Sequence, residues 1–231
     1  MGDTHEHHLK SSNFLSDIVI GLADGLTVPF ALTAGLTGAI ASTTIITTAG
    51  LAEIVAGSIA MGLGGYLSGK TEIEHYDAEL KREYLEVEVI PDKERKEVAD
   101  VMLEYGLKPE MAMDVAKAIS LDKDKWVEFM MRFELGLERP DKKRATKSAL
   151  NIGLAYVVGG LVPLAPYFYY DDVQTCLLYS SIITVFCLFI FGYFKARAIG
   201  NNALIGALQM TFIGVAAAGA AFLVAKLITD I

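Results

Sequence analysis

The chain has 231 residues, of which 53% are hydrophobic, and its formal net charge at neutral pH is −8. Its apolar residues lie in long blocks that a soluble acidic domain of this size would not contain. Its net negative charge disfavours binding of nucleic acid, which requires a basic surface. The two cysteines, Cys176 and Cys187, fall in one apolar run, where a helix holds them too far apart to form a disulfide. The sequence therefore predicts an integral membrane protein without a disulfide framework.

The polar run MGDTHEHHLKSSN, residues 1–13, predicts a flexible cytosolic tail and no cleaved signal peptide. His5, His7 and His8 within it have side chains that can bind a transition metal. A disordered tail, or the remnant of a tag, is the simpler interpretation of such a run.

Five runs are long and apolar enough to cross a bilayer, where about 20 residues suffice. They cover approximately residues 14–38, 43–69, 148–167, 173–194 and 204–228. Positive residues gather on one side of these spans, at Lys10, within 142–147, and at Lys195 and Arg197, and by the positive-inside rule that side is cytosolic. The expected fold is therefore all-α: transmembrane helices in 14–69 and 148–231, with a small cytosolic helical domain inserted at 70–147.

The first span, FLSDIVIGLADGLTVPFALTAGLT at 14–37, carries two carboxylates, Asp17 and Asp24, on one helical face. An ionisable side chain at membrane depth is unfavourable unless it is paired, hydrated or neutralised, so such residues usually mark an ion or proton path. Pro29 removes a backbone donor and frees the carbonyl of Gly25, an oxygen ligand beside Asp24. The alternative is that these aspartates lie among lipid headgroups or cap neighbouring helices.

The second span contains Glu53 and, eight residues later, Met61. A buried carboxyl prefers its neutral form, which makes Glu53 a candidate proton carrier, whereas a methionine in an apolar span usually serves packing alone. If Asp24, Glu53 and Met61 converge, their two carboxylates and one thioether suit a first-row divalent cation better than sodium, potassium or a sugar.

Small residues at spacing four allow close approach of helix backbones, within or between subunits. They occur at Gly21 and Gly25, Ala60 and Gly64, Gly65 and Gly69, and Gly214 and Ala218. Because five helices are a modest bundle for a conduit, this pattern favours a homodimer with its path at the interface.

The insert is predicted to be helical, with the second span continuing as one helix to residue 90 and a new helix beginning at Pro91. The expected packing faces are Ile73, Tyr76, Leu80, Tyr84 and Val87, then Val98, Val101, Met102 and Tyr105, then Ala112, Val115, Ala116 and Ile119, and finally Trp126, Phe129, Met130 and Phe133. Glu94 extends the second of these faces, and a glutamate at a core position is an anomaly.

The insert also carries two ExxE pairs, Glu83 with Glu86 and Glu94 with Glu97. Like charges one turn apart repel unless a cation lies between them, and carboxylates that share a divalent metal lose this repulsion. Glu134 lies one turn after Met130, so both can point at the same spot. The alternative is that these glutamates belong to solvated faces stabilised by neighbouring Lys and Arg.

These residues resemble the vacuolar iron transporter family, which includes plant nodulin-like proteins and a yeast vacuolar iron and manganese carrier. The resemblance rests on SDIVIGLADGLTVPFALTAGL in the first span, GLAEIVAGSIAMGLGGYLS in the second, and the ExxE-bearing insert before the third. It covers nearly the whole chain after residue 10. Shorter nodulin-like members lack the insert, so its presence is typical of the iron-carrying branch.

The resemblance implies five transmembrane helices, a homodimer in the vacuolar membrane, and export of cytosolic ferrous iron into the vacuole in exchange for protons. It implies a conduit in which Asp24 and Met61 hold the metal, Glu53 assists, and Asp17 lies toward the cytosolic mouth. Carried over residue by residue, the ligands of the cytosolic metal site are Glu83, Glu86, Glu94, Glu97, Met130 and Glu134, with Met131 as a further neighbour. These ligand types do not rank iron against manganese, cobalt or zinc.

Other classes are disfavoured. No CxxC, HExxH, P-loop or GxSxG motif occurs, and two aspartates on one helix could not flank a peptide bond as in an intramembrane aspartyl protease. His75 does not fit the Glu-x-x-His spacing of a ferritin-type ferroxidase. The main alternative is a membrane-anchored sensor or buffer of divalent metals, but such an anchor has no use for Asp24 and Glu53 inside the membrane.

Overall fold

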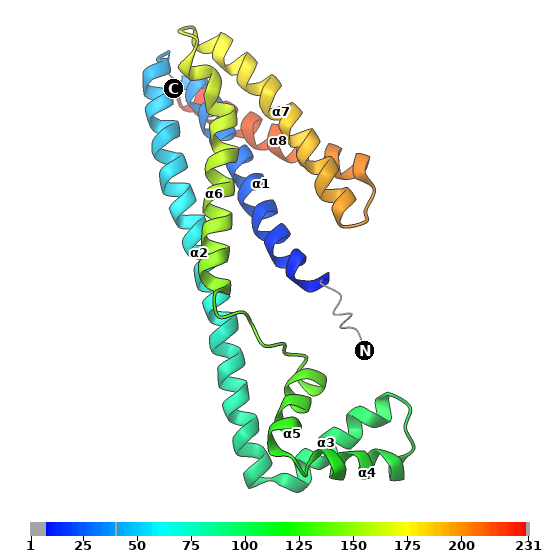
Figure 1. Cartoon of the computed structure of the whole chain (residues 1–231). Coiled ribbons are helices and arrows are strands. Elements are labelled where there is room, and N and C mark those ends of the chain that lie inside the picture. The colour runs from blue at the N-terminus through cyan, green and yellow to red at the C-terminus, as the bar shows by residue number, and fades with distance from the viewer. Residues whose placement is uncertain (1–7, 40, 230–231) are drawn as a thin grey trace, which may run out of the picture. The chain divides into compact units, whose positions relative to one another are not determined.

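The computed structural model describes residues 8–39 and 41–229, with side chains from residue 13 onward, and all regular structure in this part is helical (Figure 1). The long helices are α1 (His8–Ala39), α2 (Thr43–Val89), α6 (Arg144–Leu164), α7 (Val173–Ala198) and α8 (Ala203–Thr229). Between α2 and α6 lie α3 (Pro91–Glu104), α4 (Pro109–Ile119), α5 (Lys123–Phe129) and the π-helical turn η1 (Met130–Glu134), and a 3₁₀ turn, η2 (Ala165–Phe168), follows α6. The all-α prediction is confirmed for these residues. His5, His7 and the side chain of His8 lie outside the described part.

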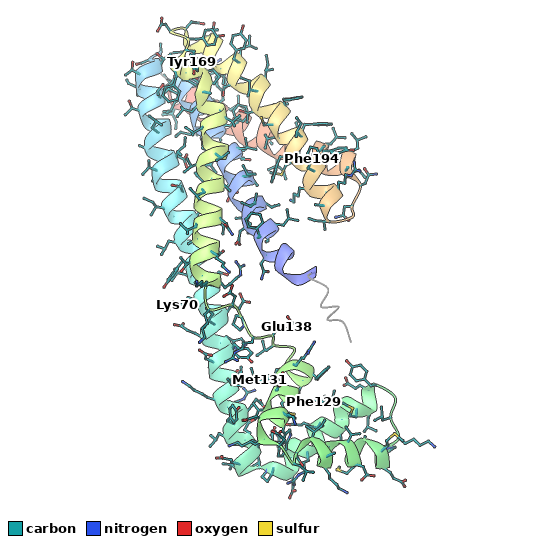
Figure 2. All side chains as sticks on the ribbon, viewed as in Figure 1. Lys70, Phe129, Met131, Glu138, Tyr169 and Phe194 are labelled. Carbon is teal, nitrogen blue, oxygen red and sulfur yellow. The ribbon has the colours of Figure 1, made fainter. Side chains whose placement is uncertain are left out.

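The five long helices are each long and apolar enough to cross a membrane, as predicted. Their outer faces carry large exposed apolar side chains, such as Ile59 on α2, Phe212 on α8, and Phe194 on α7, which is labelled in Figure 2. An apolar surface of this extent is unfavourable in water and favourable against lipid. The chain is therefore a multi-pass membrane protein.

The second helix is longer than its apolar run. It continues without a break to Val89, as expected from the lack of Gly and Pro after Gly69. The chain divides into two compact units inside this helix, between Tyr66 and Leu67. The membrane unit holds the described residues up to Tyr66 and residues 146–229, and the helical unit comprises Leu67–Ala145. The placement of the helical unit in the cytosol stays a prediction.

Glycines set the spacing of helices in the membrane unit. Gly21 and Gly25 of α1 lie against α6, and a Cβ on Gly25 would fall 2.9 Å from the Cα of Tyr156. A Cβ on Gly192 of α7 would likewise fall 2.6 Å from the carbonyl oxygen of Gly206 on α8. Contacts this close are open only to residues without a side chain. By contrast, no atom lies within 4 Å of the corresponding position on Gly64, on the exposed face of α2.

The helical unit has its own hydrophobic core. Buried residues of α3, α4 and α5, including Val98, Ala112 and Trp126, pack against Tyr76 and Leu80 of α2. This agrees with most of the predicted packing faces.

Two predicted core residues are exposed instead: Tyr105 is 69% and Phe133 is 47% accessible. Tyr105 follows the end of α3 at Glu104, where Gly106 turns the chain with a left-handed φ of 88°. Phe133 lies in the π turn, where each residue rotates less than in an α-helix, so a face extrapolated at α-helical spacing points the wrong way.

We predict that Gly25→Ala destabilises the membrane unit by about 1–3 kcal/mol, because the new methyl group would overlap the backbone of α6 and could be accommodated only by displacing that helix. The matched control is Gly219→Ala on α8, where no atom lies within 4 Å and a helical alanine is favoured over glycine by up to about 1 kcal/mol. Thermal unfolding of the detergent-solubilised protein measures both. Equal unfolding temperatures for the two variants would contradict the close α1–α6 contact.

Candidate metal centre

Three glutamates of the helical unit converge from separate elements. Glu83 of α2, Glu94 of α3 and Glu134 of η1 each present a carboxylate oxygen, and these oxygens all lie within 4.8 Å of one another. Among the described residues this is the one group of three or more acidic, His or Cys side chains with such spacing. Glu83 and Glu94 are buried and Glu134 is exposed. Carboxylate oxygens in this arrangement are suitable ligands for a divalent cation.

Two local features bring these residues together. Pro91 occupies the first position of α3, so the chain turns directly after α2 and Glu94 falls in the first turn of the new helix. In η1 the backbone N–H of Leu135 donates to the carbonyl of Met130 at 3.1 Å, a spacing of five residues. This wider turn sets the direction of Glu134, and π turns of this kind are frequent at functional sites.

The cluster contains buried carboxylate oxygens that lack hydrogen-bond partners. One oxygen of Glu83 and both oxygens of Glu94 are buried without a hydrogen-bond partner, which is unfavourable for a charged group unless a cation or a proton compensates. Burial, followed by the negative charges of Glu97 and Glu83, raises the pKa of Glu94 to about 7. Although Glu134 as a whole residue is exposed, desolvation of its carboxyl by the surrounding protein and the same two neighbours raise its pKa to about 7. The site thus holds protons near neutral pH and can exchange them for a cation.

Glu86 and Glu97 lie at the rim of this cluster with protein cations beside them. Nε of Arg82 is 3.7 Å from Glu86, and its Nη2 is 3.6 Å from Glu83. Nζ of Lys93 is 2.9 Å from Glu97 and 3.8 Å from Glu94. These ion pairs reduce the repulsion within each ExxE pair, so the ExxE spacing by itself does not require a metal. The indication of a metal site comes instead from the convergence of Glu134 and from the buried oxygens of Glu83 and Glu94 that lack a hydrogen-bond partner.

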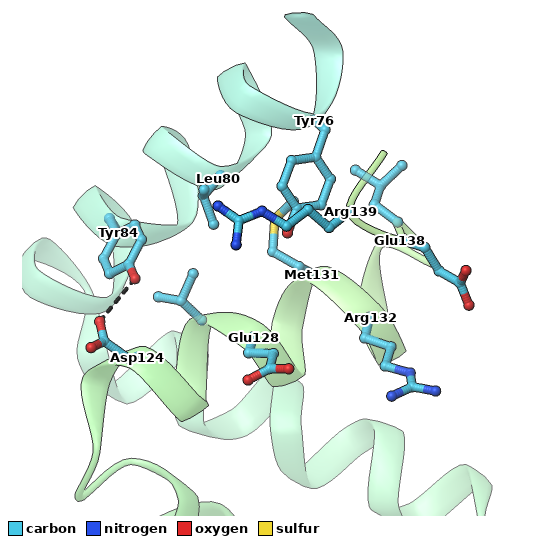
Figure 3. Close-up of a pocket in the computed structure, with 11 residues that line it drawn as sticks. Tyr76, Leu80, Tyr84, Asp124, Glu128, Met131, Arg132, Glu138 and Arg139 are labelled. Carbon is cyan, nitrogen blue, oxygen red and sulfur yellow. Dashed lines mark hydrogen bonds between the residues drawn. The ribbon is translucent and has the colours of Figure 1, made fainter. Parts of the chain in front are cut away.

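The two methionines of η1 differ in their surroundings. Met130 is fully buried one turn before Glu134. Met131 points into a separate pocket of about 530 Å³, lined also by Tyr76, Leu80 and Arg139 (Figure 3). The lining of this pocket contains none of the six predicted metal ligands. Met130 is therefore the better placed of the two to join the carboxylates.

In the membrane unit Asp17 is buried and engaged with α6. It accepts hydrogen bonds from Oγ of Ser148 at 2.9 Å and from Nδ2 of Asn151 at 3.4 Å. This geometry favours the interpretation in which Asp17 fastens neighbouring helices at the end of the bundle.

Glu53 has a partner that sequence reasoning missed. The hydroxyl of Tyr156 on α6 donates to Oε1 of Glu53, while Oε2 is buried without a partner. Tyr156 also lies close enough to Asp24 for an electrostatic interaction between them. A single tyrosine in an apolar span belongs to no sequence motif that would identify it as a hydrogen-bond partner of Glu53. The only available signal was the glycine at position 57, where a Cβ would fall 2.5 Å from Cζ of the Tyr156 ring.

Met61 lies eight residues beyond Glu53 on α2 and is half-buried. Eight residues advance a helix by about 12 Å, so Glu53 and Met61 lie at different depths along the span. Asp24 adjoins Gly25, which packs against the backbone of Tyr156. The backbone of Tyr156 therefore lies next to the residue after Asp24, while its side chain reaches Glu53.

A bundle of five membrane-crossing helices with acidic side chains inside it, joined to a carboxylate-rich helical unit, defines a polytopic membrane protein equipped to interact with cations. The chain matches the VIT family model over residues 15–226, and it belongs to that family. The resemblance inferred from the sequence is thus confirmed.

Relatives of known name match over nearly the whole chain. It is 48% identical to vacuolar iron transporter 1 of Arabidopsis thaliana, over 96% of this chain and 89% of the relative. It is 49% identical to the vacuolar iron transporter of Centaurea cyanus, over 96% and 90%. It is 48% identical to vacuolar iron transporter 2 of Oryza sativa subsp. japonica, over 99% and 94%. These names agree with the prediction of a transporter rather than an enzyme.

The raised pKa values of Glu94 and Glu134 predict a pH dependence of stability in the absence of metal. From about 4.5 to about 7 the folded protein keeps protons that the unfolded chain has lost. The contribution of these protons to the free energy of unfolding is therefore complete below pH 4.5 and disappears as the pH rises through about 7.

Thermal unfolding with a chelator present, between about pH 5 and pH 8, should show this decline in the wild type and a flatter profile in the Glu94→Gln/Glu134→Gln double variant. Asp100→Asn, at an exposed position of α3, serves as the control and should keep the wild-type profile. Identical profiles for the double variant and the wild type would contradict the assignment.

Proposed function

We propose that the protein transports ferrous iron from the cytosol into the vacuole in exchange for protons. Its relatives that match over nearly the full length are named vacuolar iron transporters. The observation that carries the proposal is Glu53, an acidic side chain inside a membrane-crossing helix with one buried oxygen unpartnered. A protein that only anchors a metal-binding domain gains nothing from such an unfavourable group, whereas a carrier of cations or protons requires one.

Iron first gathers at the helical unit, which in this proposal faces the cytosol. Glu83, Glu94 and Glu134 supply the converging oxygens, Glu86 and Glu97 attract the cation at the rim, and Met130 adds a thioether. A set of oxygen ligands with one soft sulfur binds ferrous iron, and manganese, cobalt and zinc are further candidate cargo for the same ligands. Because the carboxyls hold protons near neutral pH, binding of the metal releases protons at this point.

The translocation path in the proposal runs past Met61, then Asp24, then Glu53. The helical rise supports the place of Met61 before Glu53, because Met61 lies nearer than Glu53 to the end of α2 that enters the helical unit. Tyr156 acts as a positioning residue, because its hydroxyl orients Glu53 and leaves one oxygen for a proton or an ion. In the acidic vacuole, protons compete for these oxygens and release the metal.

A homodimer completes the path in this proposal. The outward face of α2 is exposed and small at Ala60 and Gly64, with no atom near the latter. Small residues at spacing four allow a second helix to approach closely. Two copies meeting along such faces would enclose polar side chains that a single five-helix bundle leaves half-buried.

Asp24→Asn is predicted to lower iron uptake into proteoliposomes to the level of empty vesicles, because the amide keeps the shape but cannot take up charge or protons. Binding of metal by the helical unit should remain as in the wild type. Uptake of radioactive iron and equilibrium binding in detergent measure the two properties separately. Undiminished flux in this variant would reject the assigned path.

Glu94→Gln/Glu97→Gln is predicted to weaken metal binding by the full-length protein at least about tenfold, because affinity depends on the number of charged ligands. Calorimetric titration in detergent with manganese, which does not oxidise readily, measures the loss. Asp100→Asn on the same helix is the matched control and should bind as the wild type does. Unchanged titrations for the double variant would show that the cluster is not the site.

A further inference from the structure

A second pocket lies in the membrane unit, at the corner where α7 passes into α8. It has a volume of about 350 Å³, within the range of roughly 300–1,000 Å³ that is typical of small-molecule sites. Gly192, Ala196, Gly206 and Met210 contribute to its lining and are largely buried, and the close contact of Gly192 with Gly206 holds the two helices together beside it.

The corner itself is built from specific hydrogen bonds. Gly200 adopts a left-handed φ of 80°, and the N–H of Asn201 donates to the carbonyl of Ala196 at 2.9 Å, which ends α7. Oδ1 of Asn202 accepts from the N–H groups of Leu204 and Ile205 at 3.1 and 3.2 Å, which begins α8. The carbonyl of the Asn202 amide is thereby occupied, and its NH₂ group remains a donor.

The pocket presents one sign of charge. Lys195 is its single charged lining residue, accompanied by the side-chain amides of Asn201, Asn202 and Gln209. No carboxylate lines it, and within the described part of the chain Lys195 has no ion-pair partner. These groups fit a ligand with one negative charge and several hydroxyl or ester oxygens.

The remaining walls are apolar and open to the surroundings of the bundle. Ile199, Ile205 and Ile213 line the pocket, and each is substantially exposed. Ile205 and Ile213 belong to α8, which is long and apolar enough to cross a membrane, and Ile199 directly follows the end of α7, so these exposed side chains are suited to contact with lipid. The pocket thus joins a cationic, amide-rich end to an apolar flank, as the binding site of a lipid does.

We propose that this pocket binds the headgroup of an anionic phospholipid of the phosphatidylinositol type. The single ammonium of Lys195 pairs with one phosphodiester, and the three amides bond the hydroxyls of the ring. The acyl chains lie along the isoleucines. Basic pockets between membrane helices on the cytosolic side bind anionic headgroups in this way, and the proposed orientation puts Lys195 on that side.

The test uses the full-length protein in detergent and native mass spectrometry, with phosphatidylinositol as the added lipid. Lys195→Gln is expected to weaken lipid binding about fivefold, the effect of one lysine near an anionic headgroup. Gln209→Leu is expected to weaken it as well, without changing charge. The matched control is Lys226→Gln, which removes an exposed lysine from the last turn of α8 and should leave binding unchanged.

The proposal is supported if both pocket variants lose phosphatidylinositol while unfolding at the wild-type temperature. Four results would overturn it. They are unchanged binding in both pocket variants, equal binding of phosphatidylcholine, equally tight binding of soluble glycerophosphoinositol, and a change of oligomeric mass in Lys195→Gln, which would assign this face to a second copy of the chain.

Discussion

A carboxylate removed from water must find a proton, a hydrogen-bond donor or a cation, and this constraint organises both units of the protein. The acidic side chains satisfy it to different degrees. Asp17 has donors from α6 on both of its oxygens. Glu53 has one donor, from Tyr156, and one oxygen without a partner. Both oxygens of Glu94 lack a hydrogen-bond partner. This order is consistent with a structural role for Asp17 and with the roles in translocation and metal binding that we propose for Glu53 and Glu94.

The glycines of the membrane unit make the pairing of Glu53 possible. Because Gly25 lets α1 approach the backbone of Tyr156, and Gly57 leaves room on α2 for its ring, one tyrosine reaches from α6 across to Glu53. A side chain at either glycine would push these helices apart. The glycines that allow close packing of the helix backbones therefore also allow a polar group to be placed inside the membrane unit.

The features that could be predicted from the sequence are those that repeat along it. The lengths of the apolar runs predicted the five membrane-crossing helices, and the absence of Gly and Pro after Gly69 predicted the continuation of α2. Glu94 was recognised as unusual because it is a glutamate at a position that extends an apolar packing face. The exposure of Phe133 was not predictable, because helical periodicity cannot detect a π turn. Tyr156 and the partners of Asp17 were missed for a different reason: hydrogen bonds between α1, α2 and α6 depend on tertiary packing that no local pattern encodes.

In the proposed function, buried acidic groups exist in this protein because a divalent cation passes them in exchange for protons. Sealed vesicles with an acidic interior, containing the purified protein and a pH-sensitive dye, test it most directly when ferrous iron is added outside. We expect iron to accumulate inside while the interior becomes more alkaline, and we expect both changes to require the protein. Iron that binds to the vesicles without entering, with the interior pH unchanged, would instead mark the protein as a membrane-anchored metal sensor or buffer.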